Sequence, residues 1–238
     1  MLSRQTLLGK ILRLPLSLIP RDSVVRILRG PLRGQKWIVG SFNHACWAGT
    51  YEADNLAAFA ATIRPGDSVY DVGANVGIYS LVASLKAGSA GAVYAFEPLA
   101  RNLHYLRRHL ILNRLQNCCI MEVAVSDAEG IQRFSAASWG HAMARFCEDG
   151  ELEIPTVSLD ACIYGEKELR PPNVIKIDVE GAELLVLRGA SRALTEYHPC
   201  LFIEDHGGQQ HLECRDFLAA MGYRLKEEYG RITATWEP

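Results

Sequence analysis

The sequence predicts a doubly wound α/β domain, in which helices cover both faces of a mostly parallel sheet. The first observation is the stretch 69–77, VYDVGANVG, where an apolar strand ends at Asp71 and enters a turn that holds Gly73 and Gly77. The apolar run 78–85 follows at helical length, so these pieces form a strand, a glycine turn and a helix. Further strand–helix units follow, and the chain closes on an alternating stretch typical of an antiparallel hairpin.

The composition is that of one ordinary globular domain. The chain has 238 residues, of which 49% are hydrophobic and 22% charged, and one α/β domain can use all of them. The formal net charge is −2, so the overall balance does not favour bulk electrostatic binding of nucleic acid. The seven cysteines are odd in number, scattered and without a C-x-x-C pair, which indicates reduced core cysteines in a cytoplasmic protein.

Residues 1–50 are expected to form a small N-terminal extension of the main domain, 51–238. The run 5–19 is amphipathic with interspersed basic residues, and it is too short and too often interrupted to span a membrane. We expect a helix that packs on the domain, with a helix lying on a membrane surface as the alternative. Residues 24–40 alternate apolar and polar around glycines and a proline, which predicts a hairpin.

A helix is expected over 54–63, because the Pro65-Gly66 pair that follows is a stop signal. Tyr51 and Glu52 lie just ahead of that helix. They either reach the ammonium group of a cofactor bound at the glycine turn or cap the helix, and the sequence leaves both interpretations open.

The second strand lies within 92–98, AVYAFEP, and ends at Glu97, 20 residues after Gly77. An acidic residue at the carboxyl end of this strand can accept hydrogen bonds from both hydroxyls of a ribose. A helix begins after Pro98 and runs to about residue 115. We interpret its histidines and arginines as a solvated helix face.

The stretch 118–127, CCIMEVAVSD, predicts a third strand followed by a polar turn. Asp127 in that turn either pairs with the amino group of an adenine or shapes the turn. Residues 131–157 lack a helical period and predict a β-rich insertion over the mouth of the cofactor site. Possible substrate contacts in this insertion are Trp139, His141 and Arg145.

Acidic residues follow two more predicted strands, within 173–194 and 198–207. The first strand is followed by Asp178, Glu180 and Glu183. The second is followed by Glu204, Asp205 and His206. Carboxylates at a helix start often serve as caps, but open α/β sheets bind ligands at the carboxyl ends of their strands. The two neighbouring strands are followed by more acidic residues than helix capping requires, so we expect a ligand crevice here.

The spacing of the glycine turn indicates which cofactor binds. A dinucleotide fingerprint, G-x-G-x-x-G, would place glycines where this chain has Asn75 and Ile78. The chain instead reads D-x-G-x-x-x-G, the first motif of S-adenosylmethionine-dependent methyltransferases. The terminal hairpin over 223–236, after a helix closed by Gly222, is also typical of methyltransferases rather than dehydrogenases.

With these stretches in view, the chain resembles the FkbM family of S-adenosylmethionine-dependent methyltransferases. The resemblance covers roughly residues 30–206 in family order, and KIDVEGAE is its most specific piece. The matching stretches are WAGTYE, PGDSVYDVGANVGIYSL, VYAFEP, EVAVSD, TVSLD, VIKIDVEGAELLVLRGA and LFIED. The resemblance implies a Rossmann-like class I methyltransferase sheet of seven strands with an antiparallel C-terminal hairpin. It also implies O-methylation of a hydroxyl on a sugar or natural-product acceptor.

The resemblance also implies roles for individual residues, with S-adenosyl-L-methionine as the cofactor. The methionine part would be lined by Asp71, Gly73, Ala74, Asn75 and Gly77. Glu97 would hold the ribose, with Glu52 and Asp127 as further cofactor-binding candidates. The candidates for the reacting centre are Asp178, Glu180 and His206.

The chemistry expected at this centre is an in-line transfer that needs alignment and a base. Alignment of an acceptor oxygen behind the methyl group supplies much of the acceleration, and a carboxylate or histidine can remove the hydroxyl proton. The same carboxylates could hold Mg²⁺, but we predict no metal. The alternatives are a non-catalytic binding module and, less favoured, a nicotinamide-dependent dehydrogenase. A nucleic-acid methyltransferase is disfavoured because IDVEG stands where a DPPY-like motif is expected.

Overall fold

A seven-stranded sheet forms the centre of the protein in the computed structural model, which describes residues 18–136, 144–146, 149–204, 208–228 and 230–236. In sheet order the strands are β12 (Tyr223–Glu228), β13 (Arg231–Trp236), β11 (Cys200–Glu204), β10 (Val174–Ile177), β3 (Ser68–Val72), β4 (Ala92–Phe96) and β5 (Cys118–Met121). The five strands from β11 to β5 pair in parallel, and β13 is antiparallel to both of its neighbours. The predicted sheet with an antiparallel C-terminal hairpin is confirmed.

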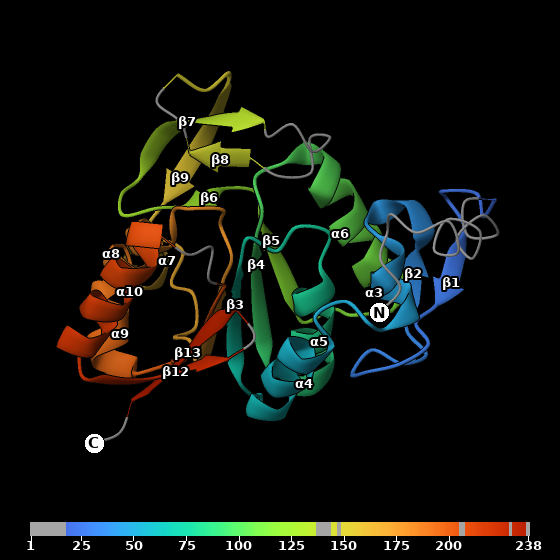
Figure 1. The fold of residues 1–238 in the computed structure, drawn as a ribbon, viewed down its shortest axis with the longest axis horizontal. Helices are drawn as coiled ribbons and strands as arrows, with labels where there is room; N and C mark the ends of the chain where they lie inside the picture. The colour runs from blue at the N-terminus through green and yellow to red at the C-terminus, as the bar shows by residue number, and fades with distance from the viewer. Residues whose placement is uncertain (1–17, 137–143, 147–148, 205–207, 229, 237–238) are drawn as a thin grey trace.

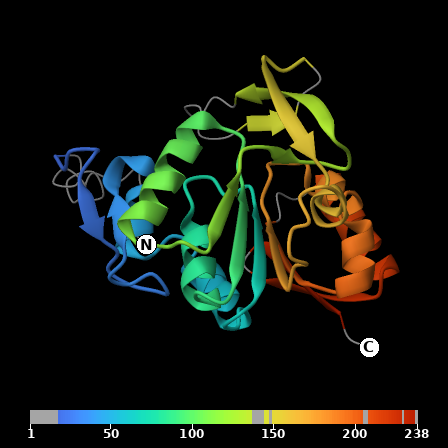
Figure 2. The same ribbon diagram turned by 180° about the vertical axis from the view of Figure 1, so that it is seen from behind.

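Helices cover both faces of this sheet, as Figures 1 and 2 show. One layer holds α4 (Ala53–Thr62), α5 (Ile78–Ala87) and α6 (Ala100–Leu112). The other holds α7 (Leu159–Tyr164), α8 (Glu183–Arg188), α9 (Ser191–Tyr197) and α10 (Gly208–Ala220). The pleat of β3 separates two apolar cores, because Val69 packs with the first layer while Tyr70 and Val72 pack with the second. All five side chains of β3 are buried.

A second, four-stranded sheet lies above the carboxyl ends of the central strands (Figure 1). Its strands, in order, are β6 (Ala124–Val125), β9 (Leu152–Val157), β7 (Gly130–Ala136) and β8 (Ala144–Phe146). The β-rich insertion is therefore confirmed, but the single strand expected over 118–127 is wrong. Pairing of β4 with β5 ends at Phe96 and Met121. Beyond that point the chain has no partner in the large sheet, so it crosses to the small one and pairs with β9.

The N-terminal segment forms the predicted hairpin, from β1 (Val24–Arg26) and β2 (Lys36–Ile38). It continues into a short 3-10 helix η1 (Val39–Ser41) and the helix α3 (His44–Ala48), which the sequence pattern did not indicate. The hairpin packs on α6, where the Trp37 ring stacks on His109 with 4.0 Å between ring centroids. The helix expected over 5–19 falls almost wholly outside the described residues. Within the described part of the chain, no helix is long and apolar enough to cross a membrane.

Candidate active site

A cavity lies at the carboxyl ends of β3, β4 and β10, where this fold places its ligands. Its floor is the glycine turn after β3, and one side comes from the residues that follow β10. The small sheet contributes Val125 and Phe134, and the N-terminal segment contributes Phe42, Cys46 and Tyr51. The lining is mostly apolar with a few convergent polar side chains, the usual character of a small-molecule site.

Gly73 is required by the geometry of the turn. Its φ is +76°, and a Cβ atom built there would lie 1.9 Å from the backbone oxygen of Asp178. The N–H groups of Gly73 and Ala74 both donate to the Phe96 oxygen, at 3.0 and 2.9 Å. The turn is therefore pressed between the ends of β4 and β10, and a side chain at position 73 would separate them.

Asn75 and Gly77 complete the turn in the same left-handed region. Asn75 has a φ of +50°, and its side-chain oxygen accepts a hydrogen bond from Val76 N at 2.8 Å. Asn is one of the residues that tolerates this conformation. Gly77 has a φ of +93°, and a Cβ atom there would lie 2.4 Å from a Leu106 methyl carbon. Gly73, Ala74 and Asn75 line the cavity, and Gly77 starts α5 beneath it.

Glu97 lines the cavity as a buried carboxylate, only 4% exposed. Its two oxygens accept hydrogen bonds from the backbone N–H groups of Asn75 and Leu99, each at 2.8 Å. Burial raises the pKa of Glu97 to about 7, against the opposing effect of the hydrogen bonds from Leu99, Asn102 and Asn75. Each carboxylate oxygen has a second lone pair, so the carboxylate that fixes the turn can still accept from a bound diol.

Asp71 lies beneath the turn, fully buried, and is not among the described residues that line the cavity. Ser80 Oγ donates to one of its oxygens at 2.6 Å, and Lys176 Nζ lies 3.4 Å from the other. In this structure Asp71 supports the site from behind. Its direct contact with a cofactor stays a prediction.

Lys176 joins the turn to the residues after β10. Its ammonium donates to the Gly73 oxygen at 2.9 Å and lies 3.3 Å from Asp178 Oδ2. Burial alone would lower the pKa of Lys176, but the carboxylates of Asp178, Asp71, Glu204 and Glu52 together raise it above its ordinary value. The side chain is therefore a permanent buried cation, which holds Asp71 and Asp178 at fixed positions.

The acidic residues after β10 divide into two groups. Asp178 and Glu180 line the cavity, whereas Glu183, the first residue of α8, accepts a hydrogen bond from Gly181 N at 3.1 Å and is not among the described lining residues. Glu204, at the end of the neighbouring strand, hydrogen-bonds to Asp178. Burial first, and then the charges of Asp178 and Glu52, together raise the pKa of Glu204 to about 8. At neutral pH a protonated Glu204 can therefore donate this hydrogen bond to Asp178.

Glu52 lies behind the cavity lining, next to Tyr79, and is not among the described lining residues. It occupies the N-cap position of α4 but makes no capping hydrogen bond, so the capping interpretation of this side chain is wrong. Its carboxylate instead accepts from the Tyr79 hydroxyl at 2.6 Å. Tyr51 and Tyr79 both line the cavity, and burial followed by the charge of Glu52 raises the pKa of each phenol. Both phenols therefore stay protonated hydrogen-bond donors.

The lining residues that the sequence did not single out include Phe42, Cys46 and Phe134. The first two come from η1 and α3, just before the WAGTYE stretch, and their proximity to that motif was the available signal. Burial raises the pKa of the Cys46 thiol to about 12, so it contributes to the wall as a neutral group.

The remaining candidates lie elsewhere. Asp127 is exposed on the turn after β6, where its carboxylate accepts from Ser126 Oγ at 3.2 Å, and it is not among the described lining residues. His206, Asp205, Trp139 and His141 fall outside the described residues, as does the side chain of Arg145. In the part of the chain that the structure describes, no group of three or more His, Cys, Asp or Glu residues is arranged to hold a metal ion.

Comparison with known proteins gives consistent matches. The family model described as the methyltransferase FkbM domain matches residues 71–225. The chain is 30% identical to the hexuronic acid methyltransferase AglP of Haloferax volcanii, over 66% of this chain and 63% of that protein. It is also 30% identical to the 31-O-demethyl-FK506 methyltransferase FkbM of Streptomyces tacrolimicus, over 55% of this chain and 62% of that protein. The chain thus spans less than two thirds of the length of either relative.

Two solved structures share the fold. Methyltransferase FkbM from Methylobacillus flagellatus superposes with a TM-score of 0.54 at 18% identity, covering 82% of this chain and 56% of that one. A SAM-dependent O-methyltransferase from Thermotoga maritima superposes with a TM-score of 0.55 at 13% identity, covering 92% and 78%. At these identities the likeness is one of fold.

Proposed function

This chain belongs to the FkbM family of methyltransferases, and we propose that it methylates a hydroxyl group on a sugar or natural-product acceptor, with S-adenosylmethionine as the donor. The observation that carries the proposal is the continuity of the cavity. One lining joins the glycine turn and Glu97 to the carboxylates of Asp178 and Glu180. Donor and acceptor groups can therefore meet in one enclosed place. The names of the two 30%-identical relatives support a hydroxyl-bearing acceptor.

The residues present fit this cofactor by their chemistry. Glu97 offers two carboxylate oxygens suited to a ribose diol, and the apolar side chains beside it suit an adenine. The opposite wall is rich in carboxylates, which suit the positive charges of an ammonium and a sulfonium. Glu52 and Tyr51 are our first candidates to accept from the ammonium group, and Asp71, held beneath the turn by Ser80 and Lys176, is the second.

S-adenosylmethionine supplies, when bound, a methyl group that its sulfonium already activates. Asp178 would accept the proton of the acceptor hydroxyl, so that the oxygen that receives the methyl group is neutral after the transfer. Lys176, 3.3 Å away, stabilises the ionised form of Asp178 that this step requires. Glu204 holds the other side of Asp178 through a hydrogen bond and positions it.

Binding of S-adenosylhomocysteine tests the cofactor half of this proposal. We expect micromolar binding by titration calorimetry and a loss of at least about 100-fold in Glu97→Gln, because one of the two backbone donors is left without an acceptor. Asp127→Asn, an equally conservative change outside the described lining, serves as the control. No binding by folded wild type would favour the non-catalytic alternative.

Transfer of a labelled methyl group tests the catalytic half. A panel of hexuronic acid glycosides and macrolide alcohols is offered as acceptors to wild type, Asp178→Asn and Glu183→Gln. We expect Asp178→Asn to keep its affinity for S-adenosylhomocysteine and to lose 100-fold or more in turnover, within the usual range for a general base. Glu183→Gln should retain turnover. Full activity in Asp178→Asn would exclude it as the base.

A further inference from the structure

The charge of this chain is divided unevenly along its length. Residues 1–50 contain eight Lys or Arg and one Asp, whereas residues 51–238 contain 17 Lys or Arg and 26 Asp or Glu. The net charge of −2 thus conceals a segment of +7 joined to a domain of −9. Such asymmetry indicates an anionic partner for the basic part, which the overall charge balance alone does not reveal.

The described part of this charge lies on the N-terminal segment and on α6, which pack on each other, and we call these basic side chains the basic face. Its described members are Arg21, Arg26, Arg29, Arg33 and Lys36 of the N-terminal segment and Arg107, Arg108 and Arg114 of α6 and its end. All are exposed except the half-buried Arg108. Arg107 pairs with Glu122 and Arg108 lies 4.0 Å from Asp22. The other six make no ion pair with another described residue.

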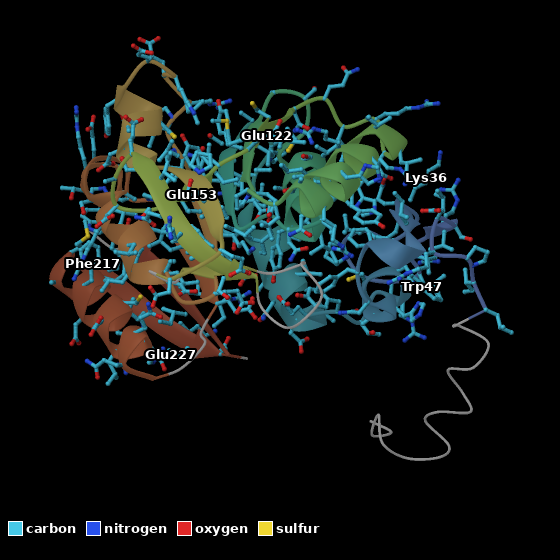
Figure 3. All side chains as sticks on the ribbon, turned by 90° about the horizontal axis from the view of Figure 1, so that it is seen from above. Lys36, Trp47, Glu122, Glu153, Phe217 and Glu227 are labelled. Atoms are coloured by element: carbon cyan, nitrogen blue, oxygen red, sulfur yellow. The ribbon has the colours of Figure 1, made fainter. Side chains whose placement is uncertain are left out.

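Contacts between the hairpin and α6 make the basic face continuous. Arg26 and Lys36 lie opposite each other in the β1–β2 pair. The backbone N–H groups of Lys36 and Ile38 donate to Asn113 Oδ1 at 2.7 Å and to His109 Nε2 at 3.1 Å. In Figure 3, α6 lies between the labelled Glu122 and Lys36, next to the hairpin that carries Lys36.

Apolar side chains are interleaved with these charges. Leu18 is 79% exposed, Val24 45%, Leu28 56% and Ile111 75%, and they are four of the eight large exposed apolar residues in the described chain. Ile111 lies one helical turn from Arg107 and Arg108 on α6, and Arg114 follows just after the end of that helix. Single exposed apolar residues need no explanation. Four of them among the segments that carry the basic face indicate a partner that also offers apolar groups.

We propose that the basic face docks the protein on an anionic lipid membrane surface. Arginines and lysines match the negative headgroups, and interleaved leucine, valine and isoleucine side chains can enter the interfacial layer. A nucleic acid would satisfy the charges but leaves the exposed Leu28 and Ile111 without an apolar partner. The proposal does not depend on the identity of the methyl acceptor.

Vesicle sedimentation tests the docking. Wild type is mixed with vesicles of phosphatidylcholine alone, or with about one third phosphatidylserine, at about 0.1 M and about 1 M salt. We expect binding to the anionic vesicles only, weakened by salt. The variant Arg29→Glu/Arg33→Glu/Lys36→Glu should lower the partition constant by about 100-fold or more, since each basic residue at such a surface contributes roughly a fivefold factor.

A matched control carries the same three charge reversals away from this face, at the exposed positions Lys86, Lys167 and Arg188. This control, Lys86→Glu/Lys167→Glu/Arg188→Glu, should keep most of the binding, and circular dichroism melts should show both triple variants folded. Equal losses in the two would show that only net charge matters and would overturn the proposal.

The apolar part of the face is tested by Leu28→Ser/Ile111→Ser, which leaves every charge in place. We expect about tenfold weaker partition, and a larger relative loss at high salt, where screening removes the electrostatic share. Unchanged vesicle binding in this variant, together with tight binding of wild type to duplex RNA, would assign the face to nucleic acid instead. If folded wild type does not bind anionic vesicles, the membrane-docking proposal is refuted directly.

Discussion

The two walls of the cavity are built in different ways. The wall formed by the glycine turn and Glu97, which we call the steric wall, is held by backbone hydrogen bonds. Asn75 N and Leu99 N donate to the Glu97 carboxylate, and Gly73 N and Ala74 N donate to the Phe96 oxygen. The wall after β10 and β11, which we call the charged wall, is held by ionisable side chains. Lys176 lies between the carboxylates of Asp71 and Asp178, and Glu204 is hydrogen-bonded to Asp178. The first wall therefore depends on steric fit and the second on charge and protonation.

In the steric wall, we expect substitution of Gly73 to cause the largest loss of stability. Gly73→Ala places a Cβ atom 1.9 Å from a backbone oxygen at a φ of +76°, so β3 and β10 must separate. We expect a loss on the order of 5 kcal/mol in the free energy of unfolding, measured by urea denaturation. Gly66→Ala has a comparable φ of +92° with no atom within 4 Å, so it should cost only about 1 kcal/mol. Similar losses in the two would show that Gly73 is not sterically confined.

In the charged wall, we expect the loss of the Lys176 ammonium to be the most destabilising change. Lys176→Met leaves Asp71 and Asp178 buried without their cation, and we expect a loss of about 3 to 5 kcal/mol in the free energy of unfolding. The exposed Lys167→Met is the control and should cost less than about 0.5 kcal/mol.

A double variant separates charge from packing at this site. Lys176→Met/Asp178→Asn removes one of the two carboxylates that have lost their cation. It should therefore recover about 1 to 2 kcal/mol of the free energy of unfolding lost in Lys176→Met. Strict additivity of the two changes would mean that the ammonium contributes through packing and its bond to Gly73, and that the wall is not organised by charge.

The difference between the walls explains what the sequence could predict. The glycine turn, Glu97 and the strand ends are local patterns, so their residues were identifiable from spacing alone. The role of Lys176 depends on Asp71 and Gly73, more than 100 positions away in the chain, and no local pattern reports such a contact. The transfer of the chain from β5 to β6 was missed for a related reason, because hydrophobic alternation continues across the point where the partner strand ends.

Opposite pH responses should distinguish the walls further. His109 supports the steric wall from α6, with Nδ1 2.8 Å from the Val76 oxygen and Nε2 accepting from Ile38. Burial lowers its pKa to about 4, so the unfolded chain binds the extra proton first. The stability due to neutral His109 is complete above about pH 6.5 and decreases as the pH falls toward 4, by about 3 kcal/mol in all.

Glu204 should respond in the reverse direction. Its pKa in the folded protein is raised to about 8, so its contribution is complete below about pH 4.5 and is lost as the pH rises through 8. Denaturation curves of wild type, His109→Gln and Glu204→Gln at several pH values measure both effects. The wild-type advantage over His109→Gln should grow from pH 4 to 6.5, and that over Glu204→Gln should shrink from pH 4.5 to 8. Parallel profiles for the two variants would contradict the assignment of the walls.

The smallest expected effect concerns the hydrogen bond between Tyr79 and Glu52. Tyr79→Phe keeps the ring packed edge-on against Phe59 but removes the 2.6 Å hydroxyl contact to the carboxylate. We expect a loss of about 1 kcal/mol in the free energy of unfolding, because a half-buried charged acceptor loses its donor. Tyr164→Phe removes a similar 2.7 Å contact to Glu196 at an exposed pair and should cost less than about 0.5 kcal/mol. If Glu52 also holds the cofactor ammonium, Tyr79→Phe alone should change the affinity for S-adenosylhomocysteine. Equal stability losses in the two tyrosine variants would place Glu52 in effective contact with water.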